Sequence, residues 1–105
     1  MHDRSYLEKI YHGRLDRKEQ LRIGLPVNGR LFERSSTEVE ATRQACHAAL
    51  IEGIAICLAG GTHHAFRDRG EGYCVFNDVA IAIKDLQLKR PGIKVMVVDL
   101  SLIHI

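Results

Sequence analysis

Two short apolar runs, separated by a glycine-rich stretch and a helical pattern, limit most strongly what this chain can fold into. The runs cover residues 54–59 and 93–100, contain several β-branched residues and are too short for typical helices. Between them, residues 75–89 have apolar side chains at helical spacing, and Pro91-Gly92 follows. Strand, loop, helix and strand form a βαβ unit, whose strands are parallel and covered on both faces. The sequence therefore predicts an α/β layered fold with a parallel β-sheet.

The part of the chain before residue 54 has helical patterns. These predict three helices, over residues 5–12, 16–22 and 35–52. Ser35 and Glu38 have the spacing of a capping box that would start the third helix, and Gly53 suits its carboxyl end. The length of 105 residues leaves room for one domain.

Composition argues against several classes of function. The net charge is +2 and basic residues alternate with acidic ones. The sequence therefore lacks the cluster of basic residues that binding to nucleic acid requires. No apolar stretch approaches the roughly 18 residues of a membrane span. The amino terminus has no apolar signal core, and Cys46, Cys57 and Cys74 form no C-x-x-C pair. We expect a protein of the reducing cytoplasm, without nucleic-acid or membrane partners.

The glycine-rich stretch, residues 60–74, is where the sequence predicts a site. It follows the carboxyl end of the first predicted strand, and Asp99 lies near the end of the second. In open α/β sheets ligands bind at the carboxyl ends of the strands, and parallel strands end at the same edge. An irregular segment of about 15 residues in a compact unit is usually functional or disordered. Phe66 and Tyr73 indicate an ordered loop, although either would also suit a core aromatic position.

The tandem histidines His63-His64 are the strongest chemical signal in this loop. Imidazole titrates near neutral pH, so a ring can accept a proton from an attacking water and return it to a leaving amine. Such a ring needs a carboxylate or carbonyl on its far nitrogen, and Asp99 is placed to serve one of the two. Asp68 and Glu71 are candidates for the other only by their proximity in sequence.

Five motifs of this chain occur together in one known family. They are H-D-R-S-Y-L-E-K-I at 2–10, R-I-G-L-P at 22–26, G-G-T-H-H-A at 60–65, G-E-G-Y-C-V-F-N-D at 70–78 and V-V-D-L at 97–100. This set closely resembles the histone deacetylase superfamily, most of all its bacterial members. The resemblance implies a part of the arginase/deacetylase-type α/β fold. It also implies hydrolysis of an acetyl-amide, either acetyl-lysine in proteins such as histones or an acetylpolyamine.

The resemblance further implies a role for each site residue. In the family a zinc ion polarises the amide carbonyl and activates a water. His64 would match the general base and acid, and His63 would act mainly electrostatically. Asp99 would match the aspartate that orients His63. Gly72 and Tyr73 would match the wall of the substrate channel.

The chain departs from the family where the metal should be held. The family continues from this aspartate as D-x-D-x-H, whereas this chain reads D-L-S-L-I, so Ser101 and Ile103 occupy the two ligand positions. A serine hydroxyl is a poor zinc ligand and isoleucine has no donor atom. We therefore expect no metal site in this chain. The resemblance implies a partial histone-deacetylase-like domain over residues 1–105, incomplete at both ends, with 101–105 a non-native tail.

Two hypotheses for function follow from this departure. The first is a fragment of a zinc-dependent amidohydrolase, a deacetylase, that is inactive as it stands, with zinc as the cofactor of the full-length parent. The second is a non-catalytic binding or regulatory module that retains part of the deacetylase fold. Sharp cooperative melting of the chain as a monomer would favour the second hypothesis.

Overall fold

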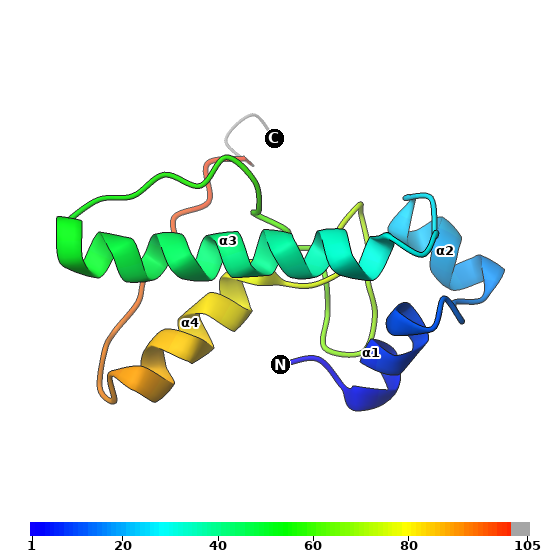
Figure 1. Ribbon diagram of the computed structural model, residues 1–105, viewed down its shortest axis with the longest axis horizontal. Coiled ribbons are helices and arrows are strands. Elements are labelled where there is room, and N and C mark those ends of the chain that lie inside the picture. Colours follow the sequence, from blue (N-terminus) through cyan, green and yellow to red (C-terminus); the bar gives the residue numbers. More distant parts are fainter. Residues whose placement is uncertain (102–105) are drawn as a thin grey trace.

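The computed structural model describes residues 1–101, which form four helices joined by irregular segments (Figure 1). The helices are α1 (Arg4–Tyr11), α2 (Arg17–Ile23), α3 (Leu31–Glu52) and α4 (Asp78–Lys89). The long α3 is the axis of the molecule, with α1 and α2 near its amino-terminal end and α4 packed along its other half (Figure 1). The four predicted helical segments are confirmed, although α3 and α4 begin at residues other than those predicted.

The predicted α/β fold with a parallel β-sheet is wrong for the part of the chain that the structure describes. Residues 54–59 and 93–100 follow irregular paths, and the one strand-type pairing within residues 1–101 is an isolated bridge between Glu71 and Cys74. Most side chains of the two runs face solvent, and Leu58 is 99% exposed. A strand obtains its hydrogen bonds and its burial from neighbouring elements, and two strands alone are at best marginally stable in water. The two runs, which lack such neighbours, stay on the surface as apolar segments.

Two helix starts show how local and tertiary forces compete. α2 begins with a capping box, in which the Asp16 carboxylate accepts the Glu19 amide and the Glu19 carboxylate accepts the Asp16 amide. The capping box predicted at Ser35 and Glu38 is wrong, because α3 begins at Leu31 and Ser35 is buried within it. Leu31 belongs to the hydrophobic core. Burial therefore extends this helix by about a turn beyond the polar signal.

The hydrophobic core lies where α1, α2 and the start of α3 meet the segment that leads into α4. Its buried members are Tyr6, Ile10, Leu15, Ile23, Leu31, Val75 and Phe76. The Tyr6 hydroxyl donates to the Val75 carbonyl at 2.8 Å, and burial raises the pKa of this phenol. The Phe76 ring meets the rings of Tyr6 and Phe32 edge to face. The core thus fixes the chain immediately before α4.

A cluster of charged side chains joins α3 to α4 away from the core. The Asp85 carboxylate of α4 lies 2.7 Å from His47 Nε2 and 3.1 Å from Arg43 Nη1, both on α3. Lys89, one turn further along α4, lies 3.4 Å from the same carboxylate. The hydrogen bonds from His47 and Arg43 lower the pKa of Asp85 to about 2. These contacts fix the two helices against each other.

Candidate active site

The candidate site is formed by the loop of residues 60–77, which connects the first apolar run to α4. Its first turn requires Gly60, whose φ of +111° is rarely adopted by other residues. A Cβ at this position would collide with the Thr42 hydroxyl of α3 and with the Asp78 carboxylate of α4. The loop therefore begins in close contact with both helices and then presents His63 and His64.

His63 has a partner at each ring nitrogen. Its Nδ1 lies 2.8 Å from the Gly61 carbonyl, and its Nε2 lies 3.5 Å from an oxygen of the Asp99 carboxylate. Because a carbonyl can only accept, Nδ1 holds a proton, and Nε2 can donate to Asp99 only when the ring is an imidazolium. The structure thus brings together His63 and Asp99, as the sequence predicts, even though the expected sheet edge is absent from residues 1–101.

His64 differs from its neighbour in its contacts within residues 1–101. The two histidine rings lie 4.2 Å apart between centroids and are tilted by 45°. His64 is exposed, and its ring makes no hydrogen bond within the described part of the chain. It also lies against Gly72, where a Cβ would come within 3.4 Å of the imidazole Cγ. An imidazole in this situation is available for proton transfer with a bound molecule.

Asp99 is held in place by the residue two positions further along. The Ser101 amide and hydroxyl both donate to Asp99 Oδ1, at 2.8 and 2.6 Å. These bonds lower the pKa of Asp99, with smaller contributions from the positive charge of His63 and His64. Asp99 is therefore a carboxylate at neutral pH, which is the form that can orient and stabilise an imidazolium.

Gly72 and Tyr73, the predicted channel wall, are positioned by the carboxyl end of α2. The Gly72 amide donates to the Arg22 carbonyl at 3.1 Å, and the Tyr73 amide donates to the Ile23 carbonyl at 2.7 Å. These carbonyls belong to the last turn of α2, where helix carbonyls lack intrahelical partners. Tyr73 has a φ of +64°, and its exposed ring lies against Gly24. Such a conformation in a non-glycine residue costs energy and is common at functional sites.

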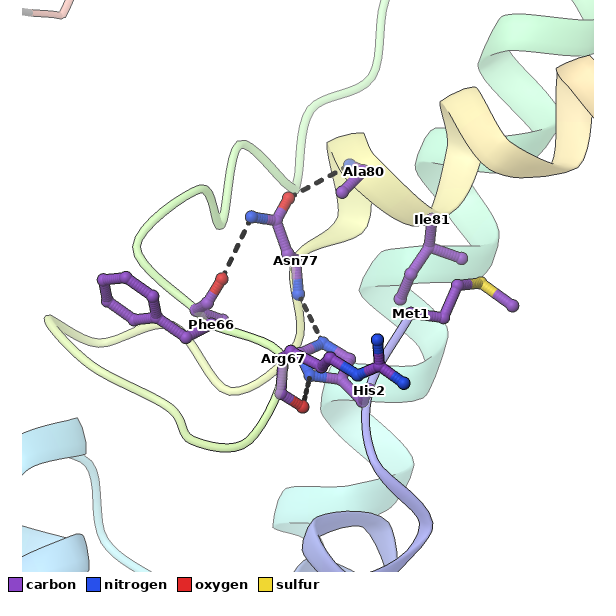
Figure 2. A pocket seen from close by; sticks show the side chains of 8 residues that line it. Met1, His2, Phe66, Arg67, Asn77, Ala80 and Ile81 are labelled. Carbon is purple, nitrogen blue, oxygen red and sulfur yellow. Dashed lines mark hydrogen bonds between the residues drawn. The ribbon is translucent and has the colours of Figure 1, made fainter.

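The amino terminus binds the same loop at Arg67 and Asn77. His2 Nδ1 donates to the Arg67 carbonyl at 3.2 Å, and His2 Nε2 accepts the Asn77 amide at 3.0 Å (Figure 2). The Asp3 amide donates to the same Arg67 carbonyl, and the two side chains form an ion pair at 2.6 Å. Burial lowers the pKa of His2. A neutral ring with its proton on Nδ1 is the form that makes both hydrogen bonds.

Sequence reasoning missed several residues that hold this loop. Asn77 and Asp78 form the start of α4, but the apolar pattern places that start at residue 75. An Asn-Asp pair directly before an apolar helical pattern is a cap signal that would have identified them. His2 has no such signal, because its partner Asn77 is 75 positions away.

The donor groups of residues 1–101 do not fit a zinc ion. Zinc in proteins is held by cysteine, histidine and carboxylate ligands, usually four or three with a water. At the expected position Asp99 is bonded to the Ser101 hydroxyl, and His63 is engaged on both nitrogens. Within residues 1–101, no group of three or more histidine, cysteine, aspartate or glutamate side chains has a geometry suitable for a metal. Ile103, the other predicted ligand position, lies outside the described residues.

Comparison with known proteins identifies the family. The histone deacetylase domain matches residues 1–104. An uncharacterized protein of Picosynechococcus sp. is 39% identical over 101 residues, which are 96% of this chain and 34% of that protein. Histone deacetylase 8 of Xenopus laevis is 32% identical over 98% of this chain and 34% of its own length. The acetoin utilization protein AcuC of Bacillus subtilis is 41% identical over 58% of this chain and 14% of its own.

This chain belongs to the histone deacetylase family, as its motifs predict. It spans about a third of the length of the curated relatives that it matches over nearly its whole length. Within residues 1–101, no helix has both the length and the apolar character needed to cross a bilayer. The cytoplasmic location stays a prediction.

Proposed function

We propose that this chain contains the proton-transfer part of a deacetylase site that hydrolyses acetyl-amides. The proposal rests on the asymmetry of the histidine pair. His63 contacts Gly61 and Asp99, whereas the His64 ring has no hydrogen-bond partner within residues 1–101 and lies against Gly72. A general base must reach the reacting water with an unoccupied nitrogen. His64 meets that requirement and is the proposed base and acid.

His63 and Asp99 would supply the electrostatic part of the reaction. In its protonated form, the His63 ring between the Gly61 carbonyl and the Asp99 carboxylate would keep a fixed orientation and place positive charge beside His64. Such a charge favours the negative charge that develops on the substrate when water attacks an amide. Gly72 and Tyr73 would line the entry for an acetylated side chain, either acetyl-lysine or an acetylpolyamine. The strained backbone at Tyr73 supports this assignment.

The proposed chemistry is incomplete in this chain. The family's zinc would polarise the amide carbonyl, but the donor set around Asp99 and Ser101 does not fit that ion. We therefore expect no hydrolysis by this chain alone. Ser101 donates hydrogen bonds to Asp99 where the family has a metal ligand. This contact favours a second candidate function, a non-catalytic module that binds the acetylated group and leaves it intact.

Binding of the substrate class tests the proposal without requiring turnover. An acetyl-lysine peptide and the same unmodified peptide are titrated into isotope-labelled protein and followed by NMR, with N-acetylspermidine as a third ligand. We expect signals of His64, Gly72 and Tyr73 to move with the acetylated ligands, and His64→Ala to reduce that response. Identical spectra with acetylated and unmodified peptide would refute the assignment.

Metal binding tests the two candidates against each other. We expect the wild-type chain to retain no zinc after dialysis, and the double variant Ser101→Asp, Ile103→His to gain affinity by about tenfold or more, because it restores the carboxylate and imidazole donors. Release of acetate by the zinc-loaded variant would favour the deacetylase part over the binding module. Tight stoichiometric zinc in the wild-type chain would show that the ligand positions are misassigned.

A further inference from the structure

Asp78, at the start of α4, is the most enclosed charged group described in the chain. It has no exposed surface, although it is ionisable. Its carboxylate accepts the Thr62 amide at 2.7 Å, the Gly61 amide at 2.9 Å and the Thr42 hydroxyl at 2.6 Å. The Thr62 hydroxyl lies 2.8 Å from it. Burial alone would raise the pKa of Asp78, but the hydrogen bonds from Thr42, Gly61 and Thr62 lower it overall.

Asn77, the residue before it, has a second set of contacts with the same loop. Its Oδ1 accepts the Ala80 amide at 3.0 Å and so caps α4. Its Nδ2 donates to the carbonyls of Ala65, at 3.1 Å, and His63, at 3.3 Å. These two carbonyls belong to the residues on either side of His64. One side chain therefore caps the helix and also holds the backbone around His64.

The two residues together bind the backbone on both sides of the histidine pair. Asp78 fixes the loop immediately before His63, and Asn77 fixes it on both sides of His64. We propose that Asn77 and Asp78 are the positioning residues of the candidate site, which transmit the fixed geometry of α4 to the two imidazoles. This inference rests on the proposed function only in assigning chemistry to the histidines.

Starting α4 does not by itself require these contacts. The helix needs an acceptor at its cap, and Asn77 Oδ1 supplies one. The side-chain hydrogen bonds of Asp78 all go to the loop or to α3, and none goes to an amide of α4 within the described residues. A buried carboxylate is costly unless it is fully hydrogen-bonded. Its placement here is explained by the loop amides that it binds.

Two variants separate positioning from helix formation. Asn77→Asp keeps the cap acceptor but removes the amide donor to the loop carbonyls. Asp78→Asn keeps the shape but removes the charge and replaces an acceptor by a donor. Asp85→Asn is the matched control, because Asp85 lies on the same helix but contacts α3 through the half-exposed cluster with Arg43 and His47, away from the loop. Amide hydrogen exchange and NOEs between the His64 ring and Gly72 are measured by NMR in all three.

We expect exchange at Gly61 and Thr62 to be about tenfold faster or more in Asp78→Asn, while the amides of α4 keep their protection. In Asn77→Asp we expect the NOEs between His64 and Gly72 to weaken while α4 stays formed. Asp85→Asn should leave both signals unchanged. A merely structural pair would instead change α4 and the loop together.

Thr42→Val keeps the inference testable if Asp78→Asn does not fold. It removes the hydroxyl that donates to the Asp78 carboxylate, with little change of shape, so exchange at Gly61 should still rise while α4 is unaffected. Equal losses of protection in the loop and α4 of both Thr42→Val and Asn77→Asp would overturn the inference, as would wild-type exchange at Gly61 and Thr62 in Asp78→Asn. Neither outcome depends on substrate, so failure of acetyl-ligand binding would refute the proposed function separately.

Discussion

The loop of residues 60–77 and the apolar runs at 54–59 and 93–100 have opposite relations to the rest of the molecule. The loop is polar and rich in glycine, yet Asp78, Asn77 and the carboxyl end of α2 bind its backbone. The runs are apolar and β-branched, yet most of their side chains face solvent. Within residues 1–101, the polar half of the loop is held by hydrogen bonds to neighbouring elements, whereas the apolar character of the two runs does not bury them.

The difference has a physical origin in where each segment finds its partners. The loop needs a few donors and acceptors at fixed points, and α2 and α4 provide them within the chain. A buried strand needs hydrogen-bonded neighbours on its edges and cover on its faces, and the described helices provide neither for the two runs. The candidate site therefore depends on the helices, and the apolar runs contribute Asp99 and little packing.

The largest loss of stability is expected when the Asp78 carboxylate, which binds the loop amides, is removed. Asp78→Ala leaves the amides of Gly61 and Thr62 and the hydroxyl of Thr42 without their acceptor, so we expect the free energy of unfolding to fall by about 3 kcal/mol. Chemical denaturation followed by circular dichroism measures it. The control Asp85→Ala, in the half-exposed cluster, should cost clearly less. Equal losses at both positions would contradict the contrast between the loop and the rest of the surface.

Adjacent glycines provide a second, smaller test. Gly60→Ala places a Cβ against Asp78 and Thr42 at a positive φ, whereas Gly61→Ala meets no atom within 4 Å and adds only backbone strain at φ +75°. We expect losses of about 2 kcal/mol for Gly60→Ala and about 1 kcal/mol for Gly61→Ala. Thermal denaturation of the pair checks the order. A greater loss at Gly61 would show that close packing does not determine the loop's first turn.

The helices were predictable because their signals are local. The apolar spacing of residues 5–12 and 16–22 predicts α1 and α2 to within about a residue, and Gly53 ends α3 in the left-handed conformation that its position predicts. The strands were not predictable in the same way. An apolar β-branched run shows only that a segment is suited to a sheet, whereas the sheet itself depends on partners elsewhere.

The candidate site was partly predictable for the same reason. The histidine pair and Asp99 are conspicuous in sequence, and the structure places His63 beside Asp99, while their catalytic roles stay predictions. The positioning residues were less accessible, since Asp78 resembles an ordinary helix start. The pairing of His2 with Asn77 joins two positions that no local pattern connects.

His2 makes the loop's stability sensitive to pH. Burial lowers its pKa from 6.5, and the hydrogen bonds to the backbone of Arg67 and Phe66 oppose this change only in part. The unfolded chain therefore binds the proton first as pH falls through 6.5, so this stabilisation is complete above that pH and is lost below it. We expect a loss of less than about 1 kcal/mol between pH 7 and 5, comparable to one hydrogen bond. Denaturation of wild type and His2→Gln at each pH measures it, and an equally steep profile in the variant would exclude His2 as the source.

The smallest effect on stability is expected in the apolar runs themselves. Ile56 is 82% exposed, so Ile56→Thr removes almost no buried surface and should change the free energy of unfolding by less than about 0.5 kcal/mol. The same change should reduce self-association, because an exposed β-branched run of low charge is a site for pairing between chains. Denaturation measures the first quantity and concentration-dependent light scattering the second. Val79→Thr, at a half-buried position of α4, is the matched control. It should lower the free energy of unfolding more than Ile56→Thr does and leave self-association unchanged. A loss above about 1 kcal/mol for Ile56→Thr would mean that the run is packed in solution, and the contrast between a bound loop and free apolar segments would then be wrong.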